Sequence, residues 1–303
     1  MGYYRASEYY SSFFGEKVYR IALDAGCTCP NRDGTCGTGG CIFCSGSGSG
    51  EFAADRNLSV TEQLSDAKAR VEAKCKSHKY IAYFQNFTNT YGDEDELRRK
   101  YIQAISDPEV VGLSIATRPD AISEKMYGIL EEVSSRTKLW IELGLQTIHE
   151  ESARWMNRGY GISVFEETVR QLHDRKIDII VHVILDLPVE TRKQMMETID
   201  YCASLPLHGI KIANLNVLAG TRLYEDYEAN PWDLMEMDEY IAFLGDVIEH
   251  LPKEMVIYRL TGDGDKKHLV APLWVADKRK VRNRIVSLFA ERDVQQGRQC
   301  RFP

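Results

Sequence analysis

The stretch CTCPNRDGTCGTGGCIFC, residues 27–44, contains five of the eight cysteines in a chain of 303 residues. Cys41 and Cys44 form a CxxC pair, and Cys29 lies twelve residues before Cys41. Thiolates are the preferred ligands of iron–sulfur clusters and of structural zinc. Three thiolates on one loop can hold three irons of a [4Fe–4S] cube and leave the fourth iron open to another ligand.

A structural zinc site is the alternative interpretation of the same loop. Such a site normally closes all four positions with two paired sets of ligands, and the sequence has no second CxxC and no HxxxH pair. Cys27 and Cys36 would be able to complete a four-thiolate site on this loop. The loop alone therefore leaves both metal centres open.

The composition of the chain predicts its cellular compartment. We see no charged-then-apolar leader, and the most apolar run, residues 179–187, is too short to span a bilayer. We expect a cytoplasmic protein without a membrane partner, in which reduced thiols bind metal rather than form disulfides. The net charge of −7 does not indicate a large nucleic-acid surface, although a basic run is present at residues 278–284.

Short β-branched segments alternate with amphipathic ones, which is the pattern of a parallel sheet covered by helices. The expected strands are residues 18–25, 79–85, 110–117, 138–146, 177–185 and 209–218, with helices such as 60–76 and 162–175 between them. The pattern predicts one α/β domain over residues 1–303, a partial (β/α)6 TIM-type barrel over about 18–220. A C-terminal α/β extension, about 221–303, would hold a helix at 237–251, a strand at 255–260 and a basic helix at 277–292.

Reactive groups of parallel α/β folds gather at the carboxyl ends of the strands. The cysteine loop follows the first expected strand, Gln85 and Asn86 follow the second, and Arg118 follows the third. Glu142 and Gln146 lie on the fourth, where a glutamate between apolar neighbours is costly without a polar partner. We therefore expect these residues to share one rim of the barrel.

Several motifs follow one another along the chain in this order: CPNRDGT with GGCIFC, YFQNFTNTYG, TRPD, IELGLQTIHEES and MNRGY. In this order, and at these strand ends, they resemble the radical S-adenosylmethionine (SAM) superfamily. Within it they resemble a bacterial branch related to the catalytic subunit of Elongator. The resemblance extends from KVYRIALDAG to RLTGD and LVAPLW, nearly the full length.

The resemblance implies that Cys29, Cys41 and Cys44 bind a [4Fe–4S] cluster, and that Cys27 and Cys36 are bystanders. The open iron would chelate SAM. An electron supplied by a partner such as flavodoxin or ferredoxin would then cleave SAM to methionine and a 5'-deoxyadenosyl radical.

The resemblance also implies contacts to SAM. Arg118 would pair with the SAM carboxylate, and Glu142 would hold the ribose hydroxyls with Gln146 nearby. Gln85 and Asn86 lie where the superfamily holds the amino end of SAM through backbone groups. Relatives usually have glycines where this chain has Asp186 and Val189, which puts the approach to adenine at that turn in doubt. His149 and His182 are interpreted as ordinary core residues.

For the substrate, the resemblance implies tRNA. The related branch is implicated in taking 5-carboxymethylaminomethyluridine at the wobble position toward 5-aminomethyluridine. The basic residues expected to meet phosphates are Arg279, Lys280, Arg282 and Arg284. The alternatives are a radical SAM enzyme acting on a small metabolite or a protein, and a non-catalytic iron–sulfur or zinc protein.

Overall fold

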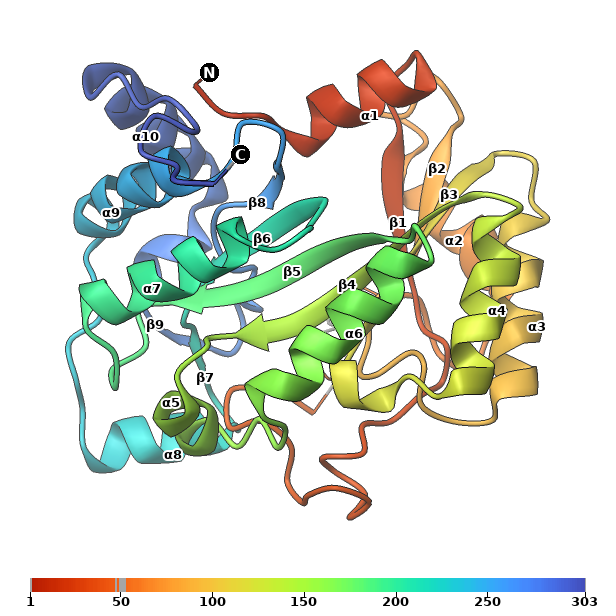
Figure 1. The fold of residues 1–303 in the computed structure, drawn as a ribbon, viewed down its shortest axis with the longest axis horizontal. Helices are drawn as coiled ribbons and strands as arrows, with labels where there is room; N and C mark the ends of the chain where they lie inside the picture. Colours follow the sequence, from red (N-terminus) through yellow and green to blue (C-terminus); the bar gives the residue numbers. More distant parts are fainter. Residues whose placement is uncertain (1, 47, 49–52, 303) are drawn as a thin grey trace.

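A computed structural model describes residues 2–46, 48 and 53–302. Part of the Ser-Gly repeat at residues 45–50 lies outside the described residues. The described chain forms a curved parallel sheet with helices on its outer face, which confirms the expected α/β partial barrel (Figure 1).

The sheet has seven strands in the order β1-β2-β3-β4-β5-β6-β8, and every neighbouring pair is parallel. The strands are β1 (Tyr19–Leu23), β2 (Tyr80–Phe84), β3 (Val110–Thr117), β4 (Lys138–Gln146), β5 (Asp178–Leu185), β6 (Gly209–Asn214) and β8 (Val256–Arg259). The expected count of six was one too low. The strand near residue 255, which we had placed in the C-terminal extension, pairs with β6 and lengthens the sheet.

Helices between consecutive strands cover the outer face of the sheet (Figure 1). They are α2 (Val60–Val71), α3 (Glu94–Ile105), α4 (Glu124–Ser134), α6 (Ile162–Asp174), α7 (Arg192–Ala203) and α9 (Met237–His250). Side chains such as Phe84 and Ile141 point outward from the strands into the core that the helices close. Polar caps fix several helix starts; the Ser59 hydroxyl, for example, accepts from the amide of Glu62 at the start of α2.

The other elements extend this frame. They are α1 (Ala6–Phe14), α5 (Glu150–Trp155), α8 (Arg222–Ala229), α10 (Lys278–Glu291), and β7 (Val217–Leu218), which pairs antiparallel with β9 (Leu269–Ala271). The basic helix expected at 277–292 is confirmed as α10. No helix among the described residues is long and apolar enough to cross a bilayer.

Helix α1 contributes to an aromatic layer at the start of the strands. Tyr10 is buried, and its ring centroid lies 5.7 Å from that of Trp140 and 5.9 Å from that of Tyr258. Tyr10 and Trp140 pack with Val18, Ile81 and Ile180 in a small apolar cluster. This layer fills the interior at the amino ends of the strands, so the hollow part of the barrel lies toward their carboxyl ends.

Candidate active site

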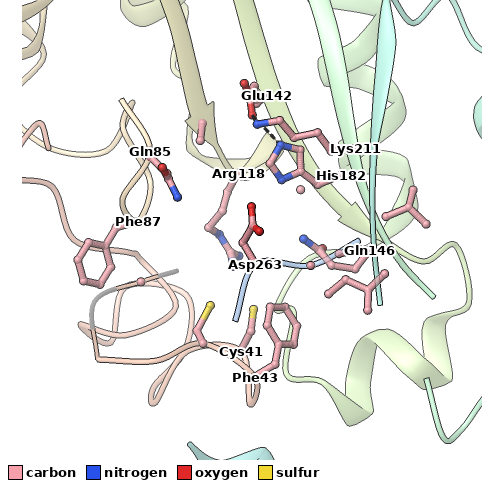
Figure 2. A pocket seen from close by; sticks show the side chains of 18 of the residues that line it. Cys41, Phe43, Gln85, Phe87, Arg118, Glu142, Gln146, His182, Lys211 and Asp263 are labelled. Atoms are coloured by element: carbon pink, nitrogen blue, oxygen red, sulfur yellow. Dashed lines mark hydrogen bonds and ion pairs between the residues drawn. The ribbon is translucent and has the colours of Figure 1, made fainter. Parts of the chain in front are cut away.

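A cavity of about 500 Å³ occupies the interior of the half-barrel. Cys29, Cys41 and Cys44 line it, as do Arg118 and Gln85. Figure 2 shows Cys41 and Phe43 at one end, and Glu142, Lys211 and His182 at the other. The sequence-predicted residues that share this cavity are Cys29, Cys41, Cys44, Gln85, Arg118, Glu142 and Gln146.

The thiol loop, residues 27–44, has little regular secondary structure and is held by amide side chains. Asn31 is fully buried, and its Nδ2 donates to the carbonyl of Asn157 at 2.6 Å. Asn157 in turn donates to the carbonyl of Gly40 at 2.7 Å. A Cβ on Gly37 would lie 2.1 Å from Oδ1 of Asn31, so only glycine fits there. These contacts join the loop to the MNRGY segment, residues 156–160.

Three of the five loop cysteines face the cavity. Cys27 is buried in the core between sheet and helices, and Cys36 is exposed, with its sulfur 3.7 Å from Nη2 of Arg118. A hydrogen bond with Cys44, and then burial, raise the pKa of Cys41. Cys41 would therefore have to lose a proton before its sulfur could bind a metal. Among the described residues, no three Cys, His, Asp or Glu side chains are grouped so as to hold a single metal ion.

Arg118 reaches the cavity from the end of β3, but its guanidinium is engaged. Nε and Nη2 donate to the carboxylate of Asp120 at 2.9 and 2.6 Å, and Nη1 donates to the carbonyl of Arg158 at 2.8 Å. Burial opposes the charge of Arg118, yet the hydrogen bond and the charge of Asp120 leave its pKa raised. A SAM carboxylate would therefore compete with Asp120 for this guanidinium.

Gln85, Asn86 and Gln146 differ in their orientation. Gln85 and Gln146 line the cavity on opposite sides (Figure 2). The side chain of Asn86 is buried away from the cavity lining and donates to Asp24 at 2.7 Å, so only the backbone of Asn86 remains for a ligand. Gln146 has a φ of 63° next to a register shift in β4, which ends the strand at the cavity.

Glu142 lies at the inner end of the cavity rather than at the rim, and it is 1% exposed. Its Oε1 accepts from Ser114 at 2.6 Å and from Arg20, while its Oε2 accepts from Lys211 and contacts Nε2 of His182 at 2.8 Å. Burial opposes ionisation, but the charges of Arg20 and Lys211 keep the pKa of Glu142 well below its usual range. Both oxygens already have protein partners, unlike those of a carboxylate that waits for ribose hydroxyls.

Three cavity residues around Glu142 were missed or dismissed from the sequence. Lys211 and Arg20 are the charged residues of GIKIAN and YRIAL, where alternation with apolar neighbours marks them as inward-facing. His182 was interpreted as a core residue, yet it lines the cavity. Burial is the main cause that lowers the pKa of His182 to about 4. A charged side chain between apolar neighbours in a strand is costly to bury without a polar partner. This reasoning singled out Glu142, and it applies equally to Arg20 and Lys211.

The turn after β5, which contains Asp186 and Val189, lies outside the cavity lining. Asp186 has a φ of 66°, a conformation that favours glycine, and its carboxylate accepts from the amide of Met235 at 2.9 Å. Burial raises the pKa of Asp186 to about 6. Val189 is exposed. An aspartate thus occupies a glycine conformation and is held there by the segment before α9.

Comparison with known proteins decides the family. A sequence profile of the Radical SAM superfamily matches residues 32–202, more than half of the chain. The chain belongs to the radical SAM superfamily. A profile of the Radical_SAM C-terminal domain matches residues 207–291. The chain is therefore a radical SAM enzyme in class, and its cofactors are a [4Fe–4S] cluster and SAM, with a reductant needed to deliver electrons.

Relatives of similar length exist. The uncharacterized protein YtqA of Bacillus subtilis is 41% identical over 98% of this chain and 92% of its own length. Protein YhcC of Escherichia coli is 32% identical over 88% of this chain and 85% of its own. The structure of Elp3 from Methanocaldococcus infernus, lacking residues 1–46, superimposes with a TM-score of 0.70 at 16% identity. It covers 92% of this chain, which spans 64% of that structure, and at this identity it shows the fold alone.

Proposed function

We propose that this radical SAM enzyme modifies the C5 side chain of wobble uridine in tRNA, converting 5-carboxymethylaminomethyluridine toward 5-aminomethyluridine. The observation that carries the proposal is one cavity with three cysteines at its mouth and a cationic inner end. The first feature suits the superfamily's cofactors, and the second suits an acidic substrate group.

Cys29, Cys41 and Cys44 would hold the cluster, since they come from one loop and line one cavity. When bound and reduced, the cluster supplies the electron that cleaves SAM to methionine and a 5'-deoxyadenosyl radical. Gln85, Arg118 and Gln146 are the side chains placed to contact SAM, with Asn86 acting through its backbone. Glu142 would act from the inner end by fixing the cations around it rather than as a direct ribose contact.

The 5'-deoxyadenosyl radical would abstract a hydrogen atom from the methylene next to the substrate carboxylate, giving 5'-deoxyadenosine and a carbon radical. Loss of one electron to the oxidised cluster and of the N–H proton would turn this radical into an imine, and water would hydrolyse the imine, once it leaves the cavity, to the 5-aminomethyl group and glyoxylate. For this the base must leave its stack and enter the mouth of the barrel. Residues of the cavity wall would then exclude water from the reacting carbon.

Helix α10 is the candidate surface for tRNA phosphates, with one correction to the expected set. Arg279, Lys280 and Arg282 are exposed. Arg284 donates to Asp238 through Nε and Nη2 at 2.8 Å and lies 3.3 Å from Glu291, so its charge is already neutralised. We therefore retain the first three residues and omit Arg284. A cytoplasmic flavodoxin or ferredoxin is the proposed reductant.

Two experiments test the proposal. Anaerobic reconstitution should give about four irons per chain, and addition of SAM and reductant should release 5'-deoxyadenosine; stable zinc without SAM cleavage would contradict it. Nucleoside mass spectrometry of tRNA from a strain lacking the gene should show accumulated 5-carboxymethylaminomethyluridine, restored to normal by the wild-type gene but not by Cys29→Ala. An unchanged nucleoside profile would remove tRNA as the substrate and leave a small metabolite or a protein.

A further inference from the structure

At the inner end of the cavity, positively charged side chains outnumber negatively charged ones. We call this region the barrel floor and define it by Arg20, Glu142, His182, Lys211 and Arg259, all of which line the cavity. Four of these residues are permanent or potential cations, and Glu142 is the one carboxylate among them. Over the whole described lining, the cationic side chains number six and the carboxylates two.

Strand register aligns the floor residues in a row. Gly144 of β4 pairs with His182 of β5, His182 pairs with Lys211 of β6, and Lys211 pairs with Arg259 of β8. Directly paired residues of neighbouring strands point to the same face of a sheet. Lys211 and Arg259 therefore lie side by side on the cavity wall, on rigid strands rather than on loops.

Arg259 is the residue of this row whose guanidinium lacks a hydrogen-bond partner among the described residues. Within the described part of the chain its guanidinium makes no hydrogen bond or ion pair, and its Nε is buried without a partner. Arg259 is half-buried, and a buried guanidinium nitrogen such as its Nε is normally paired, because an unpaired donor loses its water without compensation. Arg20, in contrast, is paired with Glu142 and lies 4.0 Å from the ring centroid of Tyr83.

Lys211 shows the same excess of charge. It contacts Glu142, and its Nζ lies 3.3 Å from the hydroxyl of Tyr83. Burial first, and then the charge of Arg20, lower the pKa of Lys211 to about 7 despite the attraction of Glu142. An additional anion beside Lys211 and Arg259 would relieve this repulsion.

We propose that Lys211 and Arg259 form an anion-binding subsite at the barrel floor that receives a carboxylate of the substrate. SAM does not account for it, because its amino and carboxylate groups belong at the cluster, and Figure 2 shows Lys211 at the end of the cavity away from Cys41. The planar guanidinium of Arg259 matches a carboxylate with two parallel hydrogen bonds. The subsite deepens the proposed function, on which it rests, because 5-carboxymethylaminomethyluridine ends in a carboxylate.

The first arm of the test needs no tRNA. The reconstituted enzyme with SAM is titrated with N-methylglycine, which reproduces the end of the proposed side chain, and with its neutral amide, by ligand-observed NMR. The wild type should bind N-methylglycine saturably and prefer it to the amide. Arg259→Gln should weaken binding about tenfold or more, whereas Arg259→Lys, which keeps the charge, should retain a measurable preference for the carboxylate.

Arg99→Gln, an exposed arginine on α3, is the matched control and should behave as the wild type. Equal binding of N-methylglycine and its amide, or wild-type affinity in Arg259→Gln, would overturn the subsite. Tighter binding of inorganic phosphate than of N-methylglycine at this site would overturn the assignment to a carboxylate. Thermal melting of each variant checks folding, and Arg259→Lys keeps the test decisive should Arg259→Gln fail to fold.

The second arm uses tRNA that carries 5-carboxymethylaminomethyluridine. Arg259→Gln should raise KM for this tRNA about tenfold or more and change kcat less, because the lost interaction is already made in the bound ground state. Raised KM with restored affinity in Arg259→Lys supports the subsite, and an unchanged KM contradicts it. Failure of the wild type to modify any tRNA would sink the proposed function, while the N-methylglycine titration would still decide the subsite.

Discussion

The two ends of the cavity differ in the chemistry of their side chains, with thiols at one end and charged groups at the other. The thiol loop offers sulfur groups on a segment that is held mainly through Asn31 and Asn157. The barrel floor offers full charges on the strands of the sheet, with Glu142 already bound by four protein groups. One end needs a cofactor to complete it, whereas the other is electrostatically organised by the protein itself.

This difference has a physical basis. A cluster is assembled after folding, so its ligands must be reachable and free to shed protons. The buried carboxylate of Glu142 cannot wait for a later partner, because its desolvation is too costly unless neighbours compensate it during folding. The floor therefore contributes to the stability of the fold, and the loop contributes mainly to the cofactor.

Loss of a loop thiol should give the largest effect. Cys29→Ala, Cys41→Ala or Cys44→Ala should abolish cluster binding and SAM cleavage, because each removes one of the three proposed iron ligands. Iron content and the visible absorption of the reconstituted protein measure this. Cys36→Ala is the control and should keep its iron; loss of the cluster in this variant would mean that the ligand set is wrong.

Loss of the floor carboxylate should instead weaken the fold. Glu142→Gln keeps the shape of the side chain but leaves Arg20 and Lys211 buried without their anion, at a cost of about 3 kcal/mol in the free energy of unfolding. Urea unfolding of the metal-free protein measures it, with Gln146→Ala at the cavity wall as the control. A cost below about 0.5 kcal/mol would erase the contrast between the two ends.

A second buried carboxylate sharpens the comparison, because Asp186 lacks the cations that surround Glu142. Burial raises its folded-state pKa to about 6. The protonated form is thus favoured in the fold, and stability contributed by this group is lost as pH rises from about 4 through 6. Asp186→Asn should be more stable than the wild type by about 2 kcal/mol at pH 7 and nearly equal to it at pH 4. Thermal unfolding at both pH values checks this, and a constant difference would contradict it.

Arg118 at the rim should give the smallest of these effects. Arg118→Lys removes the planar fork that would hold the SAM carboxylate but keeps the charge, so we expect SAM affinity to fall about tenfold, or about 1.4 kcal/mol. Equilibrium binding of SAM to the reconstituted enzyme measures it, with Arg99→Lys as the control. Wild-type affinity in Arg118→Lys would mean that Asp120, not SAM, is the permanent partner of this arginine.

The amino-acid sequence alone predicted the order of strands and helices and the position of the thiol loop after the first strand. These features follow from local periodicity and from the spacing of a few residue types, and both can be recognised in a single sequence. It also indicated that Gln85, Arg118, Glu142 and Gln146 would approach one another, because the carboxyl ends of parallel strands meet at one rim.

The folded structure was needed to show which polar side chains face one another. It turned Asn86 toward Asp24, paired Arg118 with Asp120, and assigned Arg284 to Asp238 instead of to a phosphate. It also brought β8 beside β6 and so placed Arg259 next to Lys211. Pairing between residues far apart in the chain depends on register and on the energy of burying charge, and neither can be read from local sequence.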